Sequence, residues 1–159
     1  MKKSENSLLH YKDERIVELA KKTARKTLAV WAIDCAVRVL PYFEEKYPQD
    51  RRPRNAIETL RAWIKTGVFE MAVIRGASLA SHAAAREVGA DSPARSAAHA
   101  AGQAVATAHV PAHSMGAAIY ALQAVYRAAE PQDTEAAIAR EREWQHRHLI
   151  ELGKKPESR

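Results

Sequence analysis

Four histidines occur in the alanine-rich second half of the chain, where few other side chains could do chemistry: His82, His99, His109 and His113. His109 and His113 are four residues apart, the spacing at which two imidazoles on one helical turn can bind the same metal ion. Pro111 lies between them and would break such a turn, and two histidines do not complete a four-ligand site. We therefore expect no bound metal or other cofactor, and we expect these histidines to pack in the core or at helix ends.

Asp34 is a second unusual residue, because it lies inside the apolar run from Leu28 to Leu40. Burying an unpaired charge costs several kcal/mol, so a buried Asp34 would need a partner. Arg38 lies four residues later on the same helical face and could form an ion pair within the helix. The alternative is a carboxylate that binds a ligand or takes part in catalysis.

A polar pocket could form if Asp34 met residues from another helix. His82 and Arg86 share one helical face and could face Asp34 across a bundle. The aromatic residues that could line such a pocket are Trp31, Trp63 and Tyr120. A polar cluster in an apolar wall is typical of a small-ligand site. The chain has no GxSxG elbow and no phosphate-binding glycine loop, so neither a nucleophile nor a nucleotide site is predicted.

Composition predicts one all-α domain that stays in the cytoplasm. The chain has 159 residues, 47% hydrophobic and 28% charged, which is typical of a single globular domain. No apolar run is long enough to cross a bilayer or to form a secretory signal. Cys35 is the only cysteine, so no internal disulfide can form, and its apolar neighbours predict a buried thiol.

The basic charge favours an acidic partner. The net charge is +6, spread over several short clusters such as Lys21–Lys22 and Arg51–Arg52. No helix-turn-helix pattern occurs, so we do not expect a nucleic acid partner, and a solvated basic face is the simplest interpretation.

The helices that would position these residues are predicted from segments with apolar residues at helical spacing, and Pro and Gly separate the segments. We expect a compact bundle of about five to six helices in a domain spanning residues 13–152, with flexible ends at 1–12 and 153–159. Nothing in the chain predicts a strand. The expected helices are Asp13 to Leu40, Pro53 to Gly67, Glu70 to Val88, Ser92 to His109, Ala112 to Ala129 and Thr134 to Leu152.

Alanine-rich helices must pack with their axes close together, because their side chains fill little volume. One small-residue ridge recurs at every fourth position through Ala94, Ala98, Gly102 and Ala106. A second is expected around Gly116, Ala117, Ala121 and Ala124.

Several stretches in order resemble the immunity protein family that carries an immunity-five-like domain. The stretches are LAVWAIDCAVRVLPYFEEKYPQDRRPRNAIETLRAW, ASHAAAREV, AAGQAVATAHVPAHSMGAAIYALQAV and EREWQ. They extend from about Leu28 to Gln145, which is most of the chain. The resemblance implies an all-helical cytoplasmic protein that neutralises a toxin of a bacterial polymorphic-toxin system by binding it, and it implies no catalytic residue. The family's polar positions correspond to Asp34, Arg38, Asp50, Arg52, Arg54, His82, Arg86, His109 and His113.

Three functions therefore remain open. The first is a non-catalytic immunity protein that binds a cognate protein toxin through surface arginines, Trp and Tyr side chains, Tyr120 among them. The second is a helical enzyme or sensor that binds a small ligand or a metal through the Asp, Arg and His residues. The third is a structural protein or homo-oligomer that buries a partner on its last helix, through Ile138, Trp144, Leu149 and Leu152.

Overall fold

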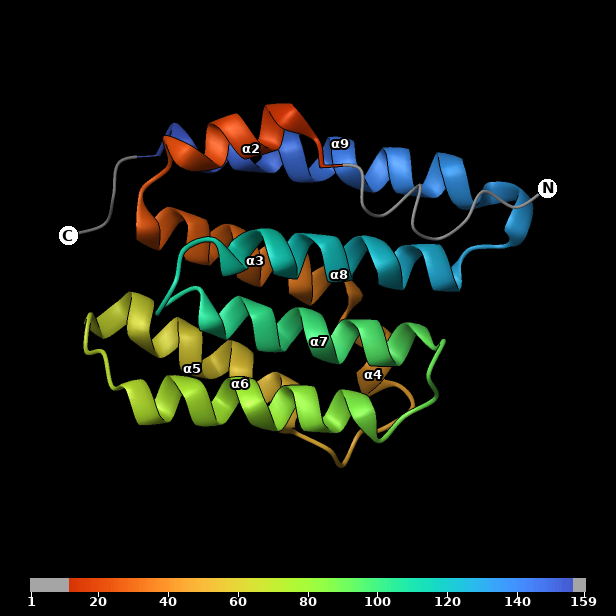
Figure 1. Ribbon diagram of the computed structural model, residues 1–159, viewed down its shortest axis with the longest axis horizontal. Coiled ribbons are helices and arrows are strands. Elements are labelled where there is room, and N and C mark those ends of the chain that lie inside the picture. The colour runs from red at the N-terminus through yellow and green to blue at the C-terminus, as the bar shows by residue number, and fades with distance from the viewer. Residues whose placement is uncertain (1–11, 156–159) are drawn as a thin grey trace.

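The computed structural model (Figure 1) describes residues 12–155 and contains only helices in that range. The predicted all-α fold is confirmed. Nowhere in residues 12–155 is a helix both long and apolar enough to cross a membrane. The elements are α2 Glu14–Lys21, α3 Arg25–Val39, α4 Pro41–Glu44, α5 Arg52–Thr66, α6 Met71–Arg86, α7 Pro93–Ala106, α8 His113–Ala128, the short 3₁₀ helix η1 Pro131–Asp133 and α9 Thr134–Gly153.

The expected number of five to six helices is wrong, because the described residues form eight α-helices. The segment expected to run from Asp13 to Leu40 is two helices separated by a break at Lys22–Ala24. Ala24 is the N-cap of α3 and has an extended backbone, and the Thr23 hydroxyl donates to the carbonyl of Leu19. Pro41 then begins α4, a single turn. The flexible ends predicted for residues 1–12 and 153–159 lie almost wholly outside the described residues.

Several other helix boundaries lie at residues with strong capping preferences, although α6 and α7 end at Arg86 and Ala106, before the expected Val88 and His109. Ser92 is the N-cap of α7 and accepts from the backbone N–H of Arg95, and Pro93 occupies the first turn. Gly67 ends α5 with φ of 70°, in the left-handed region that glycine adopts without strain. Asp133 lies at the N-cap of α9 as expected, although its side chain makes no capping hydrogen bond.

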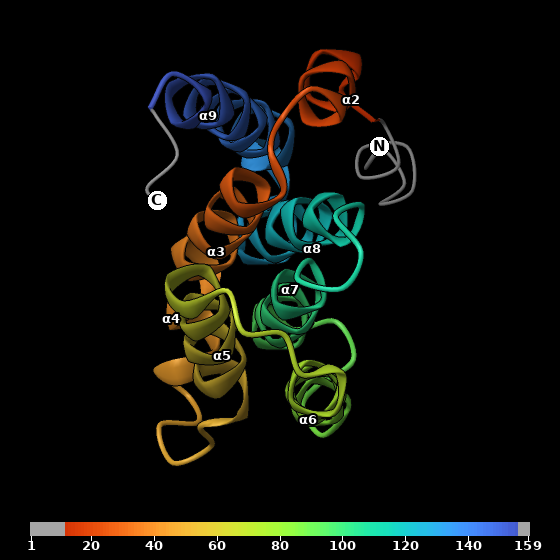
Figure 2. The same cartoon turned by 90° about the vertical axis from the view of Figure 1, so that its left-hand side faces the viewer.

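The helices form two layers, seen side by side in Figure 2. One layer contains α6, α7 and α8, and it lies in front in Figure 1. The other contains α3, α4 and α5, while α9 and α2 lie side by side above both layers. The central helix is α7, which contacts α3, α4, α5, α6 and α8 and buries nine of its fourteen residues.

Small side chains allow α7 to pack closely against its neighbours at the centre of the bundle. Ala94, Ala98 and Gly102 of the predicted ridge are buried against α6. Hydroxyls bridge the two backbones at this contact: Ser81 donates to the carbonyl of Ala98 at 2.7 Å, and Ser78 donates to that of Gly102 at 2.9 Å. The ridge is therefore used within the chain, and it brings the polar side chains of α6 close to those of α7.

Most of the apolar face of α9 is also buried against other helices of the same chain. Ile138, Leu149 and Leu152 are buried by α2, α3 and α8, while Trp144 is partly buried. One of the three open functions had this face bury a partner, whereas in the structure it closes the end of the bundle.

Candidate functional site

The first group of predicted residues lies in the seam between α3 and α9. Asp34 accepts a hydrogen bond from Nε2 of His148 at 2.6 Å, and its carboxylate is about one third exposed. The expected ion pair between Asp34 and Arg38 is therefore absent, and so is the expected pocket of Asp34 with His82. His82 pairs instead with His99 between α6 and α7.

Arg38 has a different partner, Glu141 of α9. Its guanidinium donates to both carboxylate oxygens at 2.7 to 3.1 Å, and the Glu141 side chain is 8% exposed. The same guanidinium lies 3.9 Å from the centre of the Trp144 ring, which stacks on His148. Hydrogen bonding to Glu141 raises the pKa of Arg38, so the guanidinium stays charged.

The EREWQ motif therefore holds α9 against the rest of the bundle. The backbone carbonyl of Gln145 accepts from Nε1 of the buried Trp31 at 2.9 Å, and the Gln145 amide donates to the carbonyl of Ala118. Since Trp31 and Trp63 are both buried, neither can be the surface anchor that was expected.

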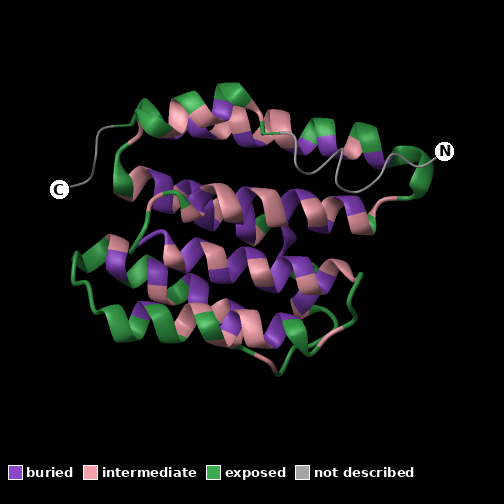
Figure 3. Ribbon diagram, in the orientation of Figure 1, coloured by how far each residue is buried: buried purple, intermediate pink, exposed green. Residues whose placement is uncertain are grey.

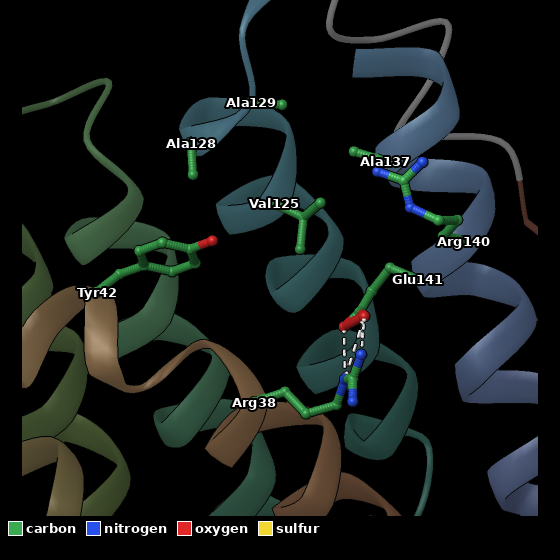
Figure 4. Close-up of a pocket in the computed structure, with 8 residues that line it drawn as sticks. All are labelled: Arg38, Tyr42, Val125, Ala128, Ala129, Ala137, Arg140 and Glu141. Carbon is green, nitrogen blue, oxygen red and sulfur yellow. Dashed lines mark hydrogen bonds and ion pairs between the residues drawn. The ribbon is translucent and has the colours of Figure 1, made fainter. Parts of the chain in front are cut away.

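An open cleft of about 380 Å³ borders this seam (Figure 4). Three alanines and Val125, at the end of α8 and on α9, form the apolar part of its walls, with Tyr42 of α4 on one side. Glu141 already neutralises Arg38, as the dashed lines in Figure 4 show. The remaining cation of the lining, Arg140, lies near Ala137 at the rim. This arrangement gives little support to a site for a small anion.

Asp50, Arg52 and Arg54 stabilise the loop between α4 and α5. Arg52 forms ion pairs with Asp50 and with Glu87 at the end of α6, and Arg54 forms one with Glu44 of α4. Each arginine lowers the pKa of its carboxylate partners through hydrogen bonds. These predicted site residues bind one another and join adjacent helices.

The second group lies on the outward face of α6, α7 and α8, here called the three-helix face. On α7 the partly exposed residues after the first turn recur as one stripe of Arg95, His99, Gln103 and Ala106. Figure 3 shows the front of α7 and α8 as mainly buried and intermediate residues. The face is therefore a surface from which half-buried polar side chains emerge.

A histidine pair lies at the centre of this face. Nδ1 of His82 and Nδ1 of His99 are 2.6 Å apart, and the His99 ring stacks on Tyr120 at 4.9 Å. At that distance one ring must donate its N–H and the other must accept, so the two Nδ1 atoms cannot both carry a proton. Burial and neighbouring cations lower the pKa of both rings, that of His99 to about 4.

The histidine pair predicts a loss of stability in mild acid. Unfolded histidine takes up a proton near pH 6.5, whereas folded His99 resists protonation to about pH 4, so the free energy of unfolding should fall as pH falls between these values. His82, Arg86, Arg95 and Arg127 all oppose the added charge. The free energy of unfolding would be measured with urea from pH 7 to 4.5 for wild type and for His99→Gln. Its decrease over this range should be about 1 kcal/mol larger for wild type. Equal slopes for the two proteins would contradict this assignment.

Glycine makes room for the pair. A Cβ added at Gly102 would lie 2.7 Å from Nε2 of His82, whereas one added at Gly76 would meet nothing within 4 Å. Both glycines lie inside helices, where alanine gains about 0.5–1 kcal/mol.

Alanine at these two positions should therefore have different effects. We expect Gly76→Ala to raise the free energy of unfolding by about that amount, and Gly102→Ala to give no gain because the His82 ring must move. Chemical denaturation of both variants tests this expectation. An equal gain from Gly102→Ala, with the imidazole NMR signals unchanged, would show that the ring is not confined.

The two histidines whose spacing could allow a shared metal ion, His109 and His113, are separated. His109 lies beyond the end of α7, is exposed and stacks on Phe69, while Nδ1 of His113 lies 2.8 Å from Oε1 of Gln103. Within residues 12–155, no three His, Cys, Asp or Glu side chains gather where they could hold a metal ion.

An apolar surface lies at the α6 N-terminal end of the three-helix face, here called the apolar end. Of the eight exposed large hydrophobic residues in the described part of the chain, five belong to it. Beside them, Met71, Leu79 and His109 border a groove of about 340 Å³. Figure 3 shows the corresponding half of α6 as largely exposed. The apolar end comprises Val68, Phe69, Met71, Leu79 and Val110.

The polar residues of the seam could be recognised in the sequence, but the residues that they bind could not. Glu141, Trp144 and His148 lie at helical spacing on α9, and that spacing could have predicted a shared face. The choice of α3 as their partner depends on tertiary packing. The apolar end was missed because its residues follow the apolar pattern of a buried helix face.

One comparison with known proteins gives a match. The family model described as "Imm-5 like putative immunity protein" matches residues 18–152. This range begins inside α2 and ends in the last turn of α9, so it includes both layers. No curated protein and no solved structure matches the chain.

Proposed function

Because this chain belongs to the Imm-5 like putative immunity protein family, we propose that it neutralises a bacterial toxin in the cytoplasm by binding it directly, without catalysis. The observation that carries the proposal is the apolar end. Val68 and Leu79 are 62% and 56% exposed, beside a groove that a partner's side chains could fill. Clustered exposed hydrophobic residues mark binding surfaces more often than isolated ones do.

The composition around this surface also supports a protein partner. Protein interfaces combine an apolar centre with a polar rim, and aromatic, Met and Arg side chains are enriched in them. The apolar end contributes Phe69 and Met71, and the groove beside it includes Arg75 and His109. These side chains could anchor a toxin without any reaction.

The motif residues outside this surface support a non-catalytic function. Asp34 binds His148, Arg38 binds Glu141, and Arg52 binds Asp50 and Glu87, so these charged groups stabilise helix contacts. Cys35 is fully buried, and burial raises the pKa of its thiol, which disfavours the nucleophilic thiolate.

Rescue from toxicity tests the proposal. Each candidate toxin domain of the source organism would be expressed from an inducible promoter in a host, with and without this chain. We expect one toxin to stop growth unless the chain is present, and the purified pair to elute together in gel filtration. Failure to rescue growth or to bind any of these domains would contradict the proposal.

A further inference from the structure

The charged side chains of α6, α7 and α8 are all arginines. The sequences of α6, α7 and α8 contain no Lys, Asp or Glu, and their charged side chains are Arg75, Arg86, Arg95 and Arg127. These three helices therefore carry a formal charge of +4 out of the chain's +6. The basic charge that looks dispersed in the sequence is partly concentrated in this layer.

The arginines surround the histidine pair in space. Arg86 lies one turn beyond His82 on α6, and Arg95 lies one turn before His99 on α7. Arg86, Arg95, Arg127 and His82 are the charged groups that lower the pKa of His99, and none of them is a carboxylate. The centre of the face is therefore a region of positive potential.

The arginines of α6, α7 and α8 also differ from the arginines elsewhere in the chain in the groups that they bind. Arg38, Arg52 and Arg54 bind carboxylates, whereas the side chains of Arg75, Arg86 and Arg95 form no ion pair or hydrogen bond with any residue in the range 12–155. Nη1 of Arg127 donates to the hydroxyl of the buried Ser96, which itself donates to Gln123.

We infer that the toxin surface docking on the three-helix face is acidic and presents carboxylates to Arg75, Arg86 and Arg95. This inference rests on the proposed function and adds the chemistry of the partner. Complementary charge steers association and selects partners, while the adjoining apolar end supplies contact area. A nucleic acid is also anionic, but the apolar end next to these arginines favours a protein, because a phosphate backbone would leave it uncovered.

A binding experiment with an acidic probe tests the inference without a toxin. A deca-glutamate peptide would be titrated into the ¹⁵N-labelled chain at about 20 mM salt, where charge interactions are weakly screened. We expect the largest shifts in the amide signals of α6 and α7 around His82, Arg86, Arg95 and His99. The variant Arg86→Glu/Arg95→Glu should bind the peptide at least about tenfold more weakly.

A matched control separates local from overall charge. Arg25→Glu/Lys26→Glu makes the same change in net charge at the start of α3, in the other layer, and should change the affinity less than about threefold. Circular dichroism and thermal melting would confirm that both variants fold. The neutral variant Arg86→Gln/Arg95→Gln should also lose affinity, to a smaller extent.

The outcomes distinguish the inference from the proposed function. No peptide binding, shifts centred outside the three-helix face, or equal losses in both charge-reversal variants would overturn the inference. Tighter binding of a ten-nucleotide DNA to the same face would also overturn it, in favour of nucleic acid. A toxin found by rescue that binds equally well at 50 and 500 mM salt would contradict only the acidic partner, whereas absence of any rescue would contradict only the proposed function.

Discussion

Replacing Phe69 and Leu79 together with aspartate is expected to abolish protection against the toxin while leaving the fold intact. Both side chains belong to the apolar end and are 43% and 56% exposed. A hot-spot side chain contributes about 2 kcal/mol or more to binding, so losing two should weaken the complex roughly a thousandfold. The measurement is growth rescue together with the dissociation constant of the purified pair.

The chain offers a matched control for this variant. Tyr42 is also a large, exposed hydrophobic residue, 38% exposed, but it lies on α4, away from the apolar end. Tyr42→Asp should retain full protection. If it abolished rescue while Phe69→Asp/Leu79→Asp retained it, the docking surface would lie at the cleft of Figure 4 and not at the apolar end.

Replacing Trp31 with alanine should give the largest loss of stability. Trp31 is fully buried on α3, and its indole N–H donates to the backbone of Gln145 on α9. Removing a buried aromatic side chain costs about 3–5 kcal/mol, because apolar contacts are lost and a cavity remains. The melting temperature should therefore fall by about 6 to 20 °C, which a thermal unfolding scan would measure.

Two further variants separate the causes of that loss. Trp31→Phe keeps most of the apolar contact but leaves the Gln145 carbonyl without this donor, so about 1–2 kcal/mol should be lost. Trp144→Ala removes a partly exposed ring and should cost less than Trp31→Ala. A melting temperature unchanged in Trp31→Ala would show that this residue does not hold α9 against α3.

Helix boundaries were predictable where one residue type determines the backbone. Pro93 after Ser92 begins α7, and Gly67 ends α5, because their conformational preferences act locally. The break between α2 and α3 was not predictable in this way. Lys22–Ala24 contains neither Gly nor Pro, and the change in direction lets α2 pack on α9 more than a hundred residues later.

The polar residues of the seam were recognised, but their partners were not. Arg38 was expected to bind Asp34 because that contact is local, at the favoured helical spacing. It binds Glu141 instead, 103 residues away, and Asp34 binds His148. The choice between a local and a distant partner depends on helix packing, which is a property of the whole bundle.

The three-helix face is a second feature that depends on helix packing and could not be predicted from local sequence. The absence of Lys, Asp and Glu from α6, α7 and α8 can be read from the sequence. However, only the two-layer arrangement shows that the arginines of these helices share one outward face beside an exposed apolar end. Leu79 illustrates the difficulty, because its helical position is typical of a buried residue although it is 56% exposed.

The most direct test of neutralisation by binding is a titration of purified toxin with the purified chain. The toxin's activity would be measured at fixed toxin concentration and increasing amounts of chain, with Phe69→Asp/Leu79→Asp as the inactive control. Direct binding predicts that inhibition is proportional to the amount of chain added and is complete at a fixed stoichiometry near one. Complete and lasting inactivation by a small fraction of one equivalent, with the toxin covalently altered, would show that the chain acts as an enzyme.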